Sequence, residues 1–229
     1  MMSEKEKAMN SPKLKSDQLC GKLIVIEGMD ASGRTTQITL LSDWLEKEGF
    51  AVTQTGLKRS RLVSESLEKA QEGNVLSPRT LSLFYATDFY DQLDNRIIPA
   101  LKSGFVVLAD RYIYTLMARD IVRGADRDWL KTLYAHALLP DMVFYLNVSW
   151  NNLLDRTLMA REKLDYWESG MDIGYSRDWF DSFKIYQKNL SDEFRKLHRS
   201  YQFKVINANR KIQTIHNELR RSILHEFEL

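Results

Sequence analysis

Apolar positions in this chain form short runs, separated by stretches in which apolar residues recur every three or four positions. We assign buried strands to the runs KLIVIEG (22–28), FAVTQTG (50–56), FVVLADRY (105–112), DMVFYLNV (141–148) and YQFKVINAN (201–209). The periodic stretches predict helices over 35–49, 60–72, 77–102, 126–138, 150–163, 176–199 and 211–226. Because strands alternate with helices, we expect an α/β fold in three layers, a parallel sheet of about five strands with helices on both faces.

The chain has 229 residues with 44% hydrophobic content, which is enough for one domain with a buried core. Residues 1–20 lack periodicity and are predicted to be a flexible tail, and residues 21–229 a single domain. The tail is charged and has no apolar segment, so we do not expect a secretory signal. No apolar run approaches the roughly 20 residues of a membrane span. A cytoplasmic protein is the expectation.

Charge and cysteine content give little sign of a macromolecular partner or a metal. Lys and Arg number 33 against 31 Asp and Glu, so we expect neither nucleic acid nor a membrane as partner. The only cysteine, Cys20, is interpreted as an inert thiol. The four histidines have no ligand spacing, so histidine-based metal binding is not expected.

The segment EGMDASGRTT (27–36) fits the phosphate-loop pattern G-x-x-x-x-G-[KR]-[ST] and lies between a predicted strand and a predicted helix. Glycines let backbone N–H groups turn inward around phosphate oxygens, and the helix points its positive dipole end at the same anion. The alternative is a chance glycine-rich turn. We predict that ATP is bound by Gly28, Met29, Asp30, Ala31, Ser32, Gly33, Arg34, Thr35 and Thr36.

At the position where this pattern usually has a lysine, the chain has Arg34. The guanidinium of arginine is a planar fork, whereas the ammonium of lysine is a compact point charge. We expect Arg34 to hold phosphates as a catalytic cation, although with a different geometry from lysine. The Thr35 hydroxyl is predicted to complete the coordination shell of a Mg²⁺ ion that also binds phosphate oxygens.

Asp110, Arg111 and Tyr112 directly follow a predicted buried strand, where ligands gather in open α/β sheets. Asp110 is a candidate catalytic residue and Mg²⁺ ligand, and Arg111 a candidate phosphate ligand. The alternative is a structural Asp–Arg pair that caps a loop.

Two further features have open interpretations. Arg156, Arg161 and Lys163 lie on a charged helix before ESGMDIG (168–174), so residues 156–176 are either a lid that brings cations to phosphates or a solvated helix face. Phe84 belongs to an aromatic stripe, which on its own favours a place in the core over a platform for a base.

From about Lys22 to the last helix, the chain resembles thymidylate kinases. The resemblance is carried by EGMDASGRTTQ, LSLFYATDFYDQ, IIPALKSG, VVLADRYIYT, LLPDMVFYLNV, LDYWE and VINAN, which occur in the family's order. It implies a P-loop NTPase-type fold, ATP with Mg²⁺, transfer of the γ-phosphoryl group to dTMP giving dTDP, and a homodimer.

The resemblance also implies roles for single residues. Asp30 would lie near the sugar of the acceptor nucleotide, and Phe84 would stack on its base, which reverses the core interpretation. Arg111 would bind the acceptor phosphate with Tyr112 beside it, and Arg161 and Lys163 would be lid cations, with Arg161 catalytic. Asp88 and Asp120 stand where the family contacts thymine, so both are candidate acceptor-binding residues.

The departures from the family pattern leave three hypotheses open. Asp88 and Asp120 are acidic, and an ionised carboxylate cannot donate to thymine O4, so thymine recognition is predicted to be weakened or changed. The family's Arg-Glu-Pro-Gly run is absent, and Lys58, Arg59 and Arg61 are candidate substitutes. The protein is therefore a dTMP kinase, a kinase for another acceptor base, or a nucleotide-binding protein with little catalytic activity.

Overall fold

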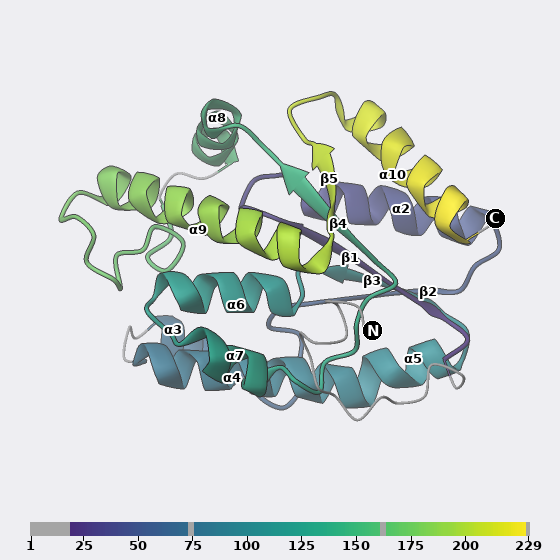
Figure 1. The fold of residues 1–229 in the computed structure, drawn as a ribbon, viewed down its shortest axis with the longest axis horizontal. Helices are drawn as coiled ribbons and strands as arrows, with labels where there is room; N and C mark the ends of the chain where they lie inside the picture. Colours follow the sequence, from purple (N-terminus) through teal and green to yellow (C-terminus); the bar gives the residue numbers. More distant parts are fainter. Residues whose placement is uncertain (1–18, 73–75, 161–163, 228–229) are drawn as a thin grey trace.

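A parallel five-stranded sheet runs through the centre of the molecule (Figure 1). The structure is a computed structural model, and it describes residues 19–72, 76–160 and 164–227. The strands lie in the order β2-β3-β1-β4-β5. Their bounds are β1 Lys22–Gly28, β2 Val52–Gly56, β3 Val106–Asp110, β4 Met142–Asn147 and β5 Lys204–Asn207. The predicted parallel sheet and its strand number are confirmed for the described residues.

Helices join the strands and cover both faces of the sheet (Figure 1). Their bounds are α2 Arg34–Lys47, α3 Ser64–Glu72, α4 Pro78–Gln92, α5 Ile98–Lys102, α6 Ile113–Val122, α7 Arg127–Leu133, α8 Trp150–Ala160, α9 Trp179–Tyr201 and α10 Ile212–Phe227. Helices α2 and α10 pack on one face, and α4, α6 and α9 lie over the other.

Alternation along the strands explains the three layers. In β1, Leu23 and Val25 belong to a buried cluster with α4, α6 and α9, whereas Ile24 and Ile26 belong to a second cluster with α2 and α10. Successive strand side chains point to opposite faces, so an unbroken apolar run supplies both cores at once. The continuous apolar runs in the sequence thus reflect a sheet that is buried on both sides.

Several elements are shorter than predicted, such as α7, which ends at Leu133, and β5, which covers only Lys204–Asn207. Two helical regions differ more strongly from the sequence prediction. The segment after β3, left without an element, forms α6, whose residues are nearly all buried. The helix predicted over 77–102 is interrupted by a π-helical turn, Leu93–Ile97, before α5. Pro99 lies in the first turn of α5, and its lack of an N–H removes one regular helical hydrogen bond at this junction.

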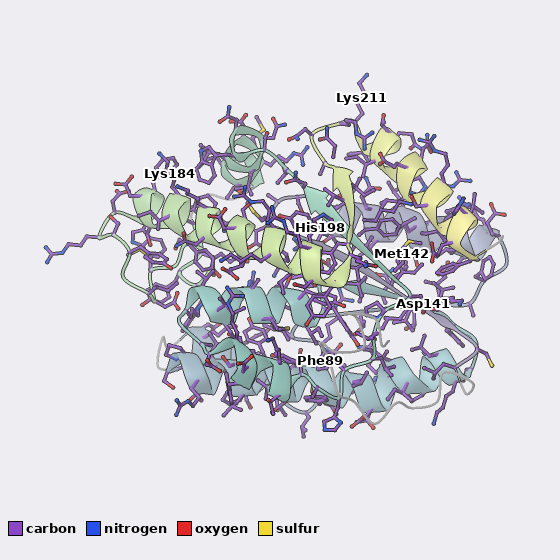
Figure 2. The ribbon with its side chains drawn as sticks, in the orientation of Figure 1. Phe89, Asp141, Met142, Lys184, His198 and Lys211 are labelled. Carbon is purple, nitrogen blue, oxygen red and sulfur yellow. The ribbon has the colours of Figure 1, made fainter. Side chains whose placement is uncertain are left out.

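The strand register brings the loops after β1, β2 and β3 together. Ile26 pairs with Asp110, and Gly56 also pairs with Asp110, so the carboxyl ends of three adjacent strands are level. Ligands in open α/β sheets bind at this edge. At the opposite edge, Asp141 accepts the backbone N–H of Leu23 (2.8 Å), which fixes the start of β1 (Figure 2).

No helix in the described parts of the chain has the length and apolar character that crossing a membrane requires.

Candidate active site

The phosphate loop joins β1 directly to α2. Ala31 (φ 58°) and Gly33 (φ 93°) adopt the left-handed conformation, and Gly28 has φ 155°. A Cβ on Gly28 would lie 2.6 Å from the Ser32 Oγ, so any other residue there would have to displace the Ser32 side chain. No side chain caps the first turn of α2, and its backbone N–H groups are available to an anion. The loop has the geometry that the sequence pattern predicts.

Arg34 folds back across this loop. Its Nε donates to Asp110 Oδ1 (2.8 Å), and its Nη1 donates to the carbonyls of Gly28 (2.6 Å) and Met29. The guanidinium donates from two separate nitrogens, whereas the three N–H groups of a lysine ammonium all start from one atom. Arg34 therefore ties the loop to the end of β3, in addition to presenting a cation at the phosphate site.

Asp110 and Thr35 form the candidate metal site. The Thr35 hydroxyl donates to Asp110 Oδ2 (2.9 Å), and Thr35 is exposed at the start of α2. A hydroxyl and a carboxylate side by side are hard oxygen ligands that suit Mg²⁺ when phosphate and water oxygens complete the shell. No group of three or more His, Cys, Asp or Glu residues that could hold a metal occurs in the described residues.

Asp30 connects the phosphate loop to two buried arginines. Its carboxylate accepts from Arg111 through Oδ1 and from Arg119 (3.2 Å) through Oδ2. Arg111 has φ 73°, held by a hydrogen bond from its N–H to the Ile26 carbonyl (3.1 Å). Burial, followed by the like charge of Arg119, lowers the pKa of Arg111 to about 9. Arg119 was not among the predicted site residues.

A fully buried glutamate, Glu27, holds the turn that carries Arg111. Glu27 Oε1 accepts from the backbone N–H groups of Tyr112 (2.9 Å) and Thr115 (3.2 Å), and Oε2 accepts from the Thr115 hydroxyl. Burial raises the pKa of Glu27 to about 7. The hydrogen bonds favour the ionised carboxylate and so limit the rise. Glu27 thus holds the backbone directly after Arg111.

The raised pKa of Glu27 predicts a pH dependence of stability. The folded protein binds this proton more tightly than the unfolded chain, so the stabilisation is complete below about pH 4.5 and is lost as the pH rises through about 7. The loss is of the order of 3 kcal/mol, since a tenfold change in proton affinity is worth about 1.4 kcal/mol. Glu27→Gln, which imitates the neutral form, should flatten this part of the curve in urea unfolding from pH 4.5 to 8. The control Glu65→Gln, at an exposed position, should leave the pH dependence of the unfolding free energy unchanged. If this pH dependence is the same in Glu27→Gln and in the parent protein, Glu27 is not its source.

Beside Arg111 lies a cavity of about 490 Å³, bounded by the loop after β2, α3, α4, α6 and the segment after α8. Its lining includes Lys58, Gln71, Tyr85, Arg111, Arg119 and Trp167, together with the carboxylates of Glu68, Glu72, Asp165 and Glu168. Of the candidate substitutes for the missing arginine run, Lys58 is the one on this wall. An aromatic ring, two arginines and a lysine in one cavity suit a nucleoside monophosphate.

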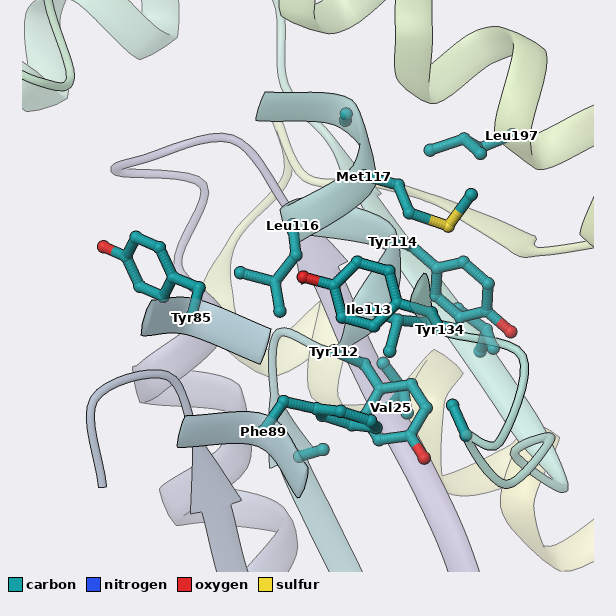
Figure 3. Close-up of a cluster of buried hydrophobic side chains, with 14 of the residues drawn as sticks. Val25, Tyr85, Phe89, Tyr112, Ile113, Tyr114, Leu116, Met117, Tyr134 and Leu197 are labelled. Carbon is teal, nitrogen blue, oxygen red and sulfur yellow. The ribbon is translucent and has the colours of Figure 1, made fainter. Parts of the chain in front are cut away.

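The cavity bears on the expected roles of Phe84 and Tyr112. Tyr85, one position after Phe84, lies on the wall, whereas Phe84 is half-buried against the core and does not line the cavity. Tyr112 is also absent from the lining, because its ring packs edge-on to Phe89 (5.1 Å between centroids) and its hydroxyl donates to the Leu138 carbonyl (Figure 3).

Asp88 is fully buried below the loop that follows β2. Its two carboxylate oxygens accept from the backbone N–H groups of Lys58 and Ser60, both at 2.8 Å, and Gln92 donates to it at 3.0 Å. The carboxylate therefore shapes the loop that places Lys58 on the cavity wall, and in this structure it does not face the cavity. Asp120 does not line this cavity either; it lines a small neighbouring pocket of about 20 Å³ and a separate cavity of about 620 Å³ beside Ser82 and Arg123.

Comparison with known proteins agrees with this site. The family model described as thymidylate kinase matches residues 26–219. The chain belongs to the thymidylate kinase family. "Probable thymidylate kinase 2" of Saccharolobus solfataricus is 38% identical over 208 residues, covering 90% of this chain and 97% of that protein. "Probable thymidylate kinase" of Thermococcus kodakarensis is 30% identical over 206 residues, covering 86% and 94%.

Membership of the thymidylate kinase family makes this protein an ATP-dependent nucleoside monophosphate kinase with a P-loop NTPase fold. The geometry offers a candidate for each of the two places that this reaction needs, the phosphate loop and the cavity beside Arg111. Asp30 belongs to the first and holds the arginines of the second. Phosphoryl transfer depends mainly on positioning and charge stabilisation, which such a link supplies.

The predicted lid is described in part. Arg156, on α8, donates to the carbonyl of Ala208 (2.8 Å), and its other Nη atom lies 3.5 Å from the Ser32 carbonyl, so it borders the phosphate loop. Arg161 and Lys163 lie outside the described residues. The segment that follows is tied to α6 and α3, because Arg123 pairs with Asp172 and Trp167 donates to the Gln71 carbonyl (3.1 Å).

Proposed function

We propose that the protein transfers the γ-phosphoryl group of ATP to dTMP, giving ADP and dTDP. The observation that carries the proposal is the link through Asp30, from a phosphate loop to a cavity with a tyrosine wall and a buried arginine pair. The names of the two relatives, "Probable thymidylate kinase 2" and "Probable thymidylate kinase", support dTMP as the acceptor.

In this proposal, residues 28–36 bind the triphosphate of ATP, and Arg156 with the lid cations Arg161 and Lys163 closes over it. Thr35 and Asp110 hold Mg²⁺, whose charge offsets that of the phosphates. Arg111 binds the acceptor phosphate as a planar fork, and Lys58 adds a second cation.

The acceptor is tested by offering purified protein ATP and Mg²⁺ with dTMP, dUMP, dCMP, UMP, CMP, AMP or GMP, and measuring ADP. We expect the highest kcat/KM for dTMP. If ADP forms only with another nucleoside monophosphate, that nucleotide is the acceptor in place of dTMP, and the protein is still a kinase. ATP binding without turnover on any acceptor would instead support a nucleotide-binding protein with little catalytic activity. That hypothesis is suggested by Arg34 in place of the usual lysine.

We also propose a homodimer that acts in the cytoplasm. Both rest on the resemblance to the family, and the dimer is tested by light scattering of the full-length chain.

A further inference from the structure

The carboxylate of Asp30 lies among three arginines. Its Oδ1 accepts from Arg111 and lies 3.9 Å from Nη2 of Arg34, and its Oδ2 accepts from Arg119 (3.2 Å). Arg34 is already paired with Asp110 (2.8 Å), so Asp30 is mainly the partner of Arg111 and Arg119. Within this cluster, two guanidiniums therefore share one carboxylate.

The cluster is largely withdrawn from water. The side chains of Asp30, Arg111 and Arg119 are 9%, 13% and 13% exposed. Charges interact strongly at such low exposure, and a buried carboxylate that loses its partner destabilises the structure around it. Asp30 therefore needs a cation in every state of the site, including the state in which a ligand engages Arg111.

Both arginines of the cluster reach the cavity in which we place the acceptor. Arg111 and Arg119 line the cavity of about 490 Å³, whereas Asp30 lines a smaller pocket of about 110 Å³ with Ala31 of the phosphate loop. Nε of each arginine is buried and has no hydrogen-bond partner among the described residues. A guanidinium that binds a phosphate as a fork uses two neighbouring nitrogens. If Arg111 uses Nε and the Nη2 that now donates to Asp30, the carboxylate loses this donor.

The two arginines differ in how the backbone carries them. Arg111 lies on a turn in the left-handed conformation (φ 73°), whereas Arg119 lies within α6. The carbonyl of Arg119 also accepts from the side chain of Arg123 (3.3 Å), which is itself paired with Asp172 (2.7 Å). Arg119 is thus fixed independently of Arg111, and it is placed to keep Asp30 when Arg111 turns to a ligand.

We propose that Arg119 is a positioning residue for phosphoryl transfer, which holds the Asp30 carboxylate when the acceptor phosphate draws Arg111 away. The proposal rests on the proposed function, in which Arg111 binds the acceptor phosphate. With Arg119 in place, Arg111 is free for the phosphate and Asp30 keeps a partner. Without Arg119, Asp30 and the phosphate compete for the same guanidinium, and the phosphate binds more weakly.

The test measures the binding of dTMP and of thymidine by calorimetry without ATP, because thymidine lacks the phosphate. The Kd for thymidine divided by the Kd for dTMP reports how much the phosphate contributes to binding. Arg119→Met should lower this ratio at least about tenfold, the scale of a lost hydrogen bond to a charged group, with the Kd for thymidine changed less than about twofold. Arg119→Lys, which keeps the charge, should bring the ratio to within about threefold of the parent protein.

A double variant shows whether Arg119 acts through Asp30. In Asp30→Asn the carboxylate becomes an uncharged amide, which no longer competes with the phosphate for Arg111. Adding Arg119→Met to Asp30→Asn should therefore change the ratio by less than about threefold. If the tenfold loss persists in the Asp30→Asn protein, Arg119 contacts the phosphate directly, and the positioning role is wrong.

Arg127→Met is the matched control. Arg127 pairs with Glu193, another carboxylate that is 9% exposed and shared with a second cation, Lys196. This variant should leave the ratio unchanged. If Arg119→Met does not fold, Arg119→Gln takes its place with the same expected loss.

Three results overturn the proposal. The first is a ratio that stays within about twofold in folded Arg119→Met or Arg119→Gln. The second is a Kd for thymidine that rises as much as the Kd for dTMP, because Arg119 would then shape the cavity as a whole. The third is an Arg119→Lys protein that binds dTMP no better than Arg119→Met.

These binding measurements also separate the inference from the proposed function. The expected binding pattern in a protein that forms no ADP would support the role of Arg119 and refute phosphoryl transfer to dTMP. If another nucleotide proves to be the acceptor, that nucleotide and its nucleoside replace dTMP and thymidine in the test. Equal Kd values for nucleotide and nucleoside in the parent protein contradict the inference, whereas ADP formation would still establish the kinase.

Discussion

Replacing Arg34 by alanine is expected to lower kcat/KM about a thousandfold, the scale seen when a cation at a transferring phosphoryl is removed. The change removes positive charge from the phosphate loop. It also leaves Asp110 without the Nε–H that donates to it and two loop carbonyls without their donor. Steady-state kinetics with ATP and dTMP measure the effect, and denaturant unfolding reports the separate loss of stability.

The Arg34→Lys variant tests whether activity needs only the positive charge of Arg34 or also the shape of its guanidinium group. Lysine keeps the charge but cannot reach Asp110 and the carbonyls of Gly28 and Met29 together, so we expect about a tenfold loss, equivalent to one or two lost hydrogen bonds. If Arg34→Lys has a higher turnover than the parent protein, arginine is an inferior replacement for the usual lysine. The site then does not depend on the planar guanidinium of Arg34.

Replacing Arg111 by methionine is expected to lower kcat/KM for dTMP by about two to three orders of magnitude, mainly through KM for the acceptor. Truncating one partner of a buried charge pair costs about 2–5 kcal/mol, and here Asp30 would keep Arg119 and the more distant Arg34 (3.9 Å). The KM for ATP should change much less, because Arg111 faces the acceptor cavity.

Arg221→Met is the control for this change, since Arg221 is exposed on α10 across the sheet. An Arg111→Met protein in which the KM for ATP rises as much as that for dTMP would show that Arg111 acts on the loop as a whole and not on the acceptor.

The sheet and the phosphate loop could be predicted from the sequence because each depends on neighbouring residues. An apolar run such as 22–28 is typical of a strand that is buried on both faces. The glycines after it determine the conformation of the phosphate loop without help from distant residues. Helix α6 was missed because its residues are buried nearly all round, which removes the polar face that marks an amphipathic helix.

The acceptor cavity could not be predicted in the same way, since it joins residues that are far apart in the chain. Whether Phe84 or Tyr85 faces it depends on the rotation of α4, and a difference of one residue turns a side chain by about 100°. Gln71 and Arg119 belong to no local motif. Their burial beside a cavity with unpaired polar atoms is visible only once α3 and α6 are placed.

The most direct test of the account follows the phosphoryl group itself. ATP labelled at the γ-phosphate is incubated with dTMP, Mg²⁺ and the protein, and the products are separated. We expect label in dTDP, at its terminal phosphate, in amounts equal to the ADP formed. Label that appears only as inorganic phosphate, or that stays in ATP although both nucleotides bind, would contradict it.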